Sequence, residues 1–122
     1  MDGCMLVNES KGTVLADRII RAGSFGRRLW GLLGRSHMPA GTAMLLVPCR
    51  QVHTFFMRFA IDVLFIDEQY RVLHMLPCMQ PYRISPYLRG ARAAVELATG
   101  TIAGTGTEVN DRLTIVHREV GL

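Results

Sequence analysis

The sequence predicts an α+β protein, a small curved β-sheet or barrel of about seven strands packed against one main helix. The chain has 122 residues, 49 % of them hydrophobic and 20 % charged. A chain of this length and composition can form one hydrophobic core but is too short for two. Short β-branched and aromatic stretches recur along it, whereas only one long segment has apolar residues at helical spacing. We therefore expect residues 1–122 to form a single domain.

Strand-like stretches alternate with turn residues along most of the chain. The first two flank the turn-forming residues 9–12, and a later one is interrupted by Pro77, which places that strand at a sheet edge or a bend because proline has no N–H to donate. The predicted strands are residues 4–8, 13–16, 43–47, 52–57, 61–66, 72–79, 93–97 and 113–117.

The main helix is expected at residues 24–34. Ser24 is a good N-cap, because its hydroxyl accepts a hydrogen bond from an otherwise unsatisfied backbone amide, and Gly34 can end the helix in a left-handed conformation. Between them an apolar stripe runs at helical spacing, formed by Phe25, Leu29, Leu32 and Leu33. A single further helical turn is expected at residues 99–104.

The positive charge is unevenly distributed. The formal net charge is +4, and Lys11 is the single lysine among 14 basic residues. Residues 18–61 and 69–95 contain no acid but 11 arginines: Arg18, Arg21, Arg27, Arg28, Arg35, Arg50, Arg58, Arg71, Arg83, Arg89 and Arg92. Arginine presents a planar fork of donors to carboxylates and phosphates, so convergence of several arginines would favour an anionic ligand. The alternative is an ordinary solvated surface.

Cysteine usage and hydropathy indicate a cytoplasmic protein. The three cysteines, Cys4, Cys49 and Cys78, are an odd number at wide spacing, which argues against a disulfide scaffold. No apolar run reaches the ~18 residues that a membrane span needs, and no signal peptide is visible. We expect free thiols, no membrane association and no cofactor.

Polar residues that could take part in catalysis or binding lie among the mostly apolar residues of the stretch PCRQVHTFFMRFAIDVLFID, residues 48–67. In a regular strand, Cys49, His53 and Met57 would share one face and Thr54 would point the other way. Asp62 is flanked by apolar residues in the next predicted strand, and Glu96 is flanked by them in a later one. Because a buried carboxylate without a partner costs several kcal/mol, we expect these groups to gather in one recess.

These polar residues could support several kinds of catalysis. Cys49 and His53 would make a nucleophile and base, and Asp62 with Glu96 an acid–base pair. The alternative in each case is a structural role, as a buried thiol beside a core histidine or as carboxylates that accept from turn amides. No paired CxxC or HxxxH element is present, so no metal site is predicted.

A separate loop carries aromatic and basic residues together. Tyr82 and Tyr87 alternate there with Arg83 and Arg89, a combination that can stack nucleic-acid bases. The loop matches no RNA-binding signature, and an ordinary turn is the alternative.

Five motifs together resemble the uncharacterised prokaryotic family called domain of unknown function 192. They are RLWGLLGR at 28–35, MPAG at 38–41, AMLLVPC at 43–49, HTFFMRFAIDVLFID at 53–67 and VELATG at 95–100. The family commonly has methionine at Leu33, proline at Ala60 and Gly-Asp where Asn110-Asp111 stands. The resemblance implies a small β-rich domain with a helix and no assigned activity. The family's signature positions coincide with Arg35, His53, Met57, Asp62 and Glu96.

The function we expect is that of a small binding module. It would hold a small anionic ligand or a peptide end in a polar pocket beside the central hairpin, with Arg35 or Arg58 as the anion fork. The lining residues are expected to be Arg35, Cys49, His53, Thr54, Met57, Arg58, Asp62 and Glu96. The alternatives are a hydrolase or transferase that uses Cys49–His53 or Asp62/Glu96, and an RNA-binding or protein-interaction domain. Nucleic acid is the less favoured partner.

Overall fold

The computed structural model describes residues 3–22, 37–55 and 57–117. Within these residues the chain forms eight strands and one short helix. They are β1 (Cys4–Asn8), β2 (Thr13–Ala16), β3 (Arg18–Ala22), β4 (Thr42–Leu46), β5 (Ile61–Ile66), β6 (Val72–Met79), β7 (Ala93–Leu97), α2 (Thr101–Thr105) and β8 (Leu113–His117). The predicted α+β class is confirmed. The helix predicted at 24–34 lies outside the described residues.

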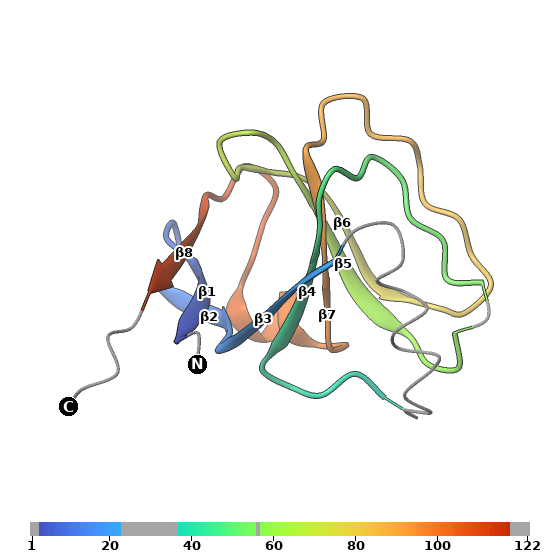
Figure 1. Cartoon of the computed structure of the whole chain (residues 1–122), viewed down its shortest axis with the longest axis horizontal. Coiled ribbons are helices and arrows are strands. Elements are labelled where there is room, and N and C mark those ends of the chain that lie inside the picture. The colour runs from blue at the N-terminus through green and yellow to red at the C-terminus, as the bar shows by residue number, and fades with distance from the viewer. Residues whose placement is uncertain (1–2, 23–36, 56, 118–122) are drawn as a thin grey trace.

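The strands make two sheets (Figure 1). The smaller has the order β2-β1-β8, and the larger has the order β3-β4-β7-β5-β6. Neighbouring strands are antiparallel except β3 and β4, which run parallel. Parallel neighbours need a crossover connection, here residues 23–41. In this order β7 lies between β4 and β5, so the central strands of the larger sheet come from distant parts of the sequence.

Two apolar clusters cover the two faces of the larger sheet. The inner cluster fills the space between the sheets, with Leu6 and Leu113 from the smaller and Leu45, Leu64 and Val95 from the larger. The outer cluster lies on the opposite face, under the two long loops that follow β4 and β6, and includes Met44, Val52, Met57, Val63 and Phe65. As a result β4, β5 and β7 are buried at every position.

Strand β3 was not predicted. Its sequence RIIRA is short, its Arg18 and Arg21 are exposed and its remaining residues are half-buried. It joins the sheet only at the edge beside β4, so it lacks the continuous apolar character of the buried strands. Its parallel register sets Arg21 beside Leu45.

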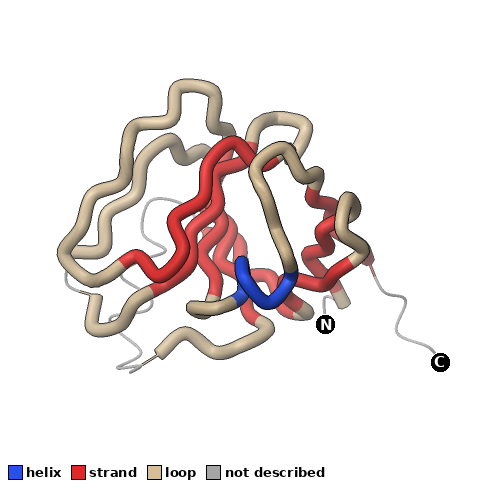
Figure 2. Tube along the Cα trace, turned by 180° about the vertical axis from the view of Figure 1, so that it is seen from behind, coloured by secondary structure: helices blue, strands red, loops and turns tan. Residues whose placement is uncertain are grey.

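The strand predicted at 52–57 is not regular. His53 makes one isolated antiparallel bridge with Ile84, and the two loops run side by side (Figures 1 and 2). Backbone hydrogen bonds join Leu88 N to Arg50 O, and Ser85 N to Val52 O. A continuous ladder does not form because Pro81 and Pro86 have no N–H to contribute and Tyr82 has a φ of 61°.

Strand β6 lies at the sheet edge, as Pro77 indicated. Two of its residues, Pro77 and Cys78, lie opposite Asp62, because Ile61 pairs with Met79 and Val63 pairs with Leu76. This is a β-bulge, and Cys78 within it has a φ of 53°. Helix α2 follows β7 and lies against the inner cluster through Ile102 (Figure 2).

Candidate functional site

The Asp62 carboxylate is held by two backbone amides. Its Oδ1 accepts from Cys78 N at 2.8 Å and its Oδ2 accepts from Ile102 N at 2.9 Å. The first amide belongs to the bulge in β6, and the second to the first turn of α2, where Gly100 provides no side-chain cap. Asp62 is 1 % exposed. Both donors would otherwise lack an acceptor in the protein, so the carboxylate completes the backbone hydrogen bonding of two elements at once.

Glu96 faces the opposite side of the same sheet. It pairs with Met44 on β4 and with Val63 on β5, and both of these belong to the outer cluster, as does Ala94 two residues earlier on β7. Asp62 pairs with Leu97, a residue of the inner cluster. The structure therefore does not bring the two carboxylates together, and the acid–base pair considered from the sequence has no geometric support.

The remaining predicted residues divide among several environments. Met57 is buried in the outer cluster and Cys49 packs against it, on the face that carries Glu96. Arg58 is exposed and His53 is exposed, its Nδ1 accepting from Phe55 N at 3.3 Å. The thiol of Cys49 donates to Gln51 O at 3.3 Å. Arg35 lies outside the described residues.

Thr54 joins the two long loops. Its Oγ1 donates to Gln80 O at 2.6 Å and accepts from Arg83 N at 2.9 Å, while its backbone O accepts from Tyr82 N at 2.9 Å. Thr54 is fully buried. Thr54 therefore connects two segments that lie 26 to 29 residues apart in the sequence, which is a structural role.

A buried polar network, which the sequence did not suggest, closes one end of the smaller sheet. Asn8 Nδ2 donates to Asp111 Oδ2 at 2.9 Å and to Thr107 Oγ1 at 3.1 Å. Lys11 Nζ lies 3.0 Å from Asp111 Oδ1 and 2.9 Å from Glu108 Oε1. The network ties the β1–β2 turn to the loop before β8.

The network shifts two pKa values in opposite directions. Burial raises the pKa of the Asp111 carboxyl, but hydrogen bonds from Asn8, from the Glu108 amide and from Lys11 outweigh it, so that this pKa lies below its ordinary 3.8. Hydrogen bonds to Glu108 and then Asp111 raise the pKa of Lys11. Both shifts favour the charged forms, as expected of a structural ion pair.

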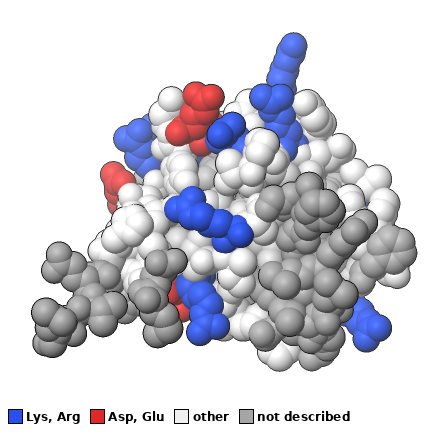
Figure 3. Space-filling model, viewed as in Figure 1, with Lys and Arg blue, Asp and Glu red and all other residues white. Residues whose placement is uncertain are grey.

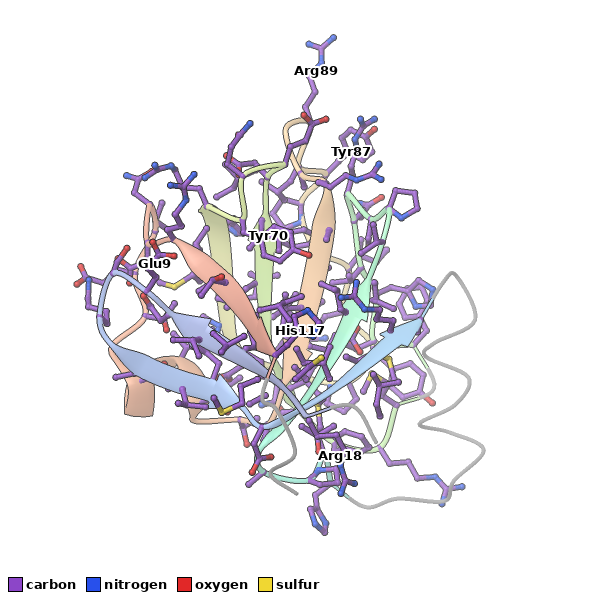
Figure 4. All side chains as sticks on the ribbon, turned by 60° about the vertical axis from the view of Figure 1, so that its left-hand side comes forward. Glu9, Arg18, Tyr70, Tyr87, Arg89 and His117 are labelled. Atoms are coloured by element: carbon purple, nitrogen blue, oxygen red, sulfur yellow. The ribbon has the colours of Figure 1, made fainter. Side chains whose placement is uncertain are left out.

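A hollow of about 480 Å³ opens on the inner face of the larger sheet, beside the turn of the β5–β6 hairpin. Its apolar floor comes from β4 and β7 and includes Leu45 and Ala93, and Tyr70 lines it from the hairpin turn. Figure 4 shows the Tyr70 side chain lying between the strands of the two sheets. Arg21 of β3 and Arg92, just before β7, also line it. Two arginines thus line one hollow with an apolar floor.

The arginines of this hollow are not committed to other groups within the described part of the chain. There the side chains of Arg21 and Arg92 make no hydrogen bond or ion pair, although Glu68 also lines the hollow. A second hollow, of about 350 Å³, adjoins the first and shares Glu68 and Arg92 with it. Arg50 and Arg89 line the second hollow. Figure 3 shows basic side chains at the top of the molecule, beside an acidic group, and others across the middle of the same face.

Of the residues predicted from the sequence, the seven that the structure describes do not line the first hollow. The signal that pointed towards it was the acid-free distribution of arginines, which includes both Arg21 and Arg92. The sequence did not show which arginines converge, because Arg21 is on the unpredicted strand β3 and reaches the hollow only through the parallel pairing of β3 with β4.

Among residues 3–22, 37–55 and 57–117, no group of three or more His, Cys, Asp or Glu side chains is arranged to hold a metal ion. In the same residues, no helix has the length and apolar character that crossing a membrane requires.

The fold and this hollow define a small two-sheet β-rich domain in which two arginines line a hollow on the inner face of the larger sheet. The sequence profile of the family DUF192, described as "Uncharacterized ACR", matches residues 6–115, and the chain belongs to this family. A UPF0127 protein of Pyrococcus furiosus is 32 % identical over 113 residues, covering 88 % of this chain and 95 % of the relative. A UPF0127 protein of Thermococcus sibiricus is 29 % identical over 113 residues, covering 89 % of this chain and 73 % of the relative.

A solved structure shares the fold. The crystal structure of a protein of unknown function from Novosphingobium aromaticivorans superposes with a TM-score of 0.70 at 19 % identity, covering 91 % of this chain and 82 % of that one. The likeness at this identity concerns the fold, and function has to be argued from the site.

Proposed function

We propose that this protein is a binding module for a small anionic molecule, and that the hollow lined by Arg21, Arg92 and Tyr70 is its binding site. The observation that carries the proposal is one hollow with an apolar floor that is lined by two arginines, neither of which makes a side-chain hydrogen bond or ion pair within the described part of the chain. Guanidinium groups bind carboxylates and phosphates through paired, charge-assisted hydrogen bonds. The proposed site differs from the one expected from the sequence, which was placed around residues 48–67 with Arg35 or Arg58 as the anion fork.

Each lining group has a distinct role in this proposal. Arg21 and Arg92 hold the anion from two sides, and the floor of Leu45 and Ala93 contacts the apolar part of the ligand. Glu68 opposes a highly charged ligand by Coulomb repulsion. The site therefore favours a ligand with one anionic group on an apolar body over a free multivalent anion.

The test is a thermal-shift and calorimetric titration with inorganic phosphate and with short-chain carboxylates of increasing apolar length. We expect the carboxylates to raise Tm more as they lengthen, because a ligand that binds only the folded state stabilises it. Loss of one arginine contact costs about 1.5–3 kcal/mol for a charge-assisted hydrogen bond, so Arg92→Ala should weaken binding about tenfold or more.

Arg18→Ala is the matched control. Arg18 is an exposed arginine on the same strand as Arg21, it does not line the hollow, and Figure 4 shows it at the bottom of the view, well away from Tyr70. Its loss removes the same charge without touching the hollow. The proposal is contradicted by the absence of any response to these anions, or by an equal loss of binding in Arg18→Ala and Arg92→Ala.

A second candidate function is the binding of single-stranded nucleic acid by the two long loops. The ring of Phe55 lies 4.9 Å from that of His53 and 6.5 Å from that of Tyr82, measured between centroids. Phe55 is 38 % exposed and Tyr82 59 % exposed. Exposed rings beside arginines such as Arg83 can stack bases. Only this ring group favours the candidate, and the uncommitted arginines of the hollow favour the first proposal over it.

A further inference from the structure

A cysteine and a histidine from opposite ends of the sequence meet on the smaller sheet. Cys4 is the first residue of β1 and His117 the last of β8, and the two are directly opposite in the antiparallel register. Cys4 Sγ lies 3.1 Å from His117 Nδ1. The sequence suggested Cys49 with His53 as a thiol–imidazole pair, but the contacts described for those two groups lead to the backbone at Gln51 and Phe55.

The pair is accessible and held by the fold. Cys4 is half-buried and His117 is exposed, so a small reagent can reach the sulfur from solvent. The register that brings them together continues through the pairs Leu6–Ile115 and Asn8–Leu113. Of these residues, Leu6 and Leu113 belong to the inner cluster and Ile115 packs against it. The contact therefore depends on the core and not on the conformation of a loop.

We propose that Cys4 is a thiol modification site and that it takes small disulfides, with His117 as the proton acceptor. A neutral imidazole that carries its proton on Nε2 presents Nδ1 to the thiol S–H. The thiolate, and not the thiol, is the attacking form in exchange with a disulfide, so a proton acceptor within hydrogen-bond distance of the sulfur assists the reaction.

The step is a thiol–disulfide exchange. The sulfur of Cys4 attacks one sulfur of the disulfide, a new S–S bond forms and the reagent's own S–S bond breaks. The thiol proton passes to His117 Nδ1, and the departing thiolate takes up a proton from the imidazolium or from water. One thiol is consumed and one thiol is released, and the protein is left as a mixed disulfide.

Cys78 is an internal control. It is exposed, and the described contact of its sulfur is with the side-chain amide of Gln80, whose Nε2 lies 3.2 Å away and accepts no proton. If exposure alone governed reactivity, Cys78 would react faster than the half-buried Cys4. The proposal requires the opposite order.

The experiment is a time course of labelling by Ellman's reagent and by iodoacetamide at neutral pH, with each cysteine peptide quantified by mass spectrometry. We expect Cys4 to react about tenfold faster than Cys78, a part of the roughly 10²- to 10⁴-fold that a positioned proton acceptor supplies in enzymes. His117→Asn, which keeps a hydrogen-bonding side chain but cannot take up a proton, should slow Cys4 and leave Cys78 unchanged.

Two results would overturn the proposal. One is a Cys4 rate in the unmodified chain at or below that of Cys78, a comparison that needs no variant and no assumption about folding. The other is a His117→Asn variant, with an unchanged Tm, in which the ratio of the two rates stays the same. Because neither measurement involves the hollow near Tyr70, anion binding and thiol reactivity succeed or fail separately.

Discussion

Asp62 and Glu96 lie one register step apart on the adjacent strands β5 and β7, yet their side chains face opposite sides of the larger sheet. Asp62 reaches the bulge of β6 and the start of α2, whereas Glu96 lies over the outer cluster with Met44 and Val63. Two buried carboxylates close in the sheet thus belong to different environments. The first of them leads directly to a prediction about stability.

Asp62→Asn should destabilise the fold by about 1–3 kcal/mol, the cost of leaving a buried donor without its acceptor. The amide side chain has one acceptor oxygen, so either Cys78 N or Ile102 N loses its partner. Chemical denaturation measures the change. Asp67→Asn is the control, because Asp67 also accepts from two backbone amides but in a turn open to water. Equal losses in the two variants would contradict the role assigned to Asp62.

Thr54→Val should lower the free energy of unfolding by about 1–3 kcal/mol, since the nearly isosteric side chain leaves Gln80 O and Arg83 N unsatisfied. Thr54→Ser keeps the hydroxyl and should cost less, about the loss of one buried methyl group. Hydrogen exchange of the Arg83 amide gives a local readout. Faster exchange in the valine variant alone is expected, and unchanged exchange there would rule out the connection between the loops.

Protonation of Asp111 at acid pH should lower the stability of the fold. A carboxyl whose pKa is lowered in the folded state contributes stability that is present above its unfolded value, near 3.8, and is lost as the pH falls through the folded pKa. Thermal unfolding between about pH 6 and about pH 2 measures the slope. Asp111→Asn removes the titrating group and should flatten this part of the profile. A variant with the same acid slope as the parent chain would show that the stabilisation lies elsewhere.

Glu68→Gln should strengthen anion binding at the proposed site. The substitution removes the negative charge that lines both adjoining hollows and leaves Arg21 and Arg92 in place. At an exposed site the Coulomb gain is about 1 kcal/mol or less, equivalent to a few-fold decrease in Kd at low salt, and it should shrink as salt is added. Calorimetric titration with a short-chain carboxylate provides the measurement. Weaker binding in this variant would argue against an anion in the hollow.

Tyr82→Ala separates the second candidate function from the first. If the loops bind single-stranded RNA, loss of the ring that lies against Phe55 should weaken binding by about 1–3 kcal/mol per stacked base. Tyr87→Ala removes an equally exposed tyrosine of the same loop that has no ring contact among the described residues. Fluorescence polarisation with a labelled oligonucleotide at low salt measures both. Equal or absent effects would leave the loops without a role in nucleic-acid binding.

Most of the strands could be predicted from local patterns in the sequence. The stretches 4–8, 13–16, 61–66, 72–79, 93–97 and 113–117 coincide with β1, β2, β5, β6, β7 and β8, because β-branched and apolar residues between turn residues are a local signal. Pro77 likewise marked an edge strand. The family resemblance and the concentration of arginine were also readable at this level.

The directions of the polar side chains, and the contacts between them, could not be predicted without the three-dimensional fold. The buried strands β4, β5 and β7 are covered on both faces, so their sequences show no alternation of polar and apolar residues from which a face can be assigned. The groupings of Arg21 with Arg92 and of Cys4 with His117 depend on strand order, which joins residues 71 and 113 positions apart. A short stretch of sequence does not show which distant strand will be its neighbour, because strand order depends on how the whole chain buries its apolar residues.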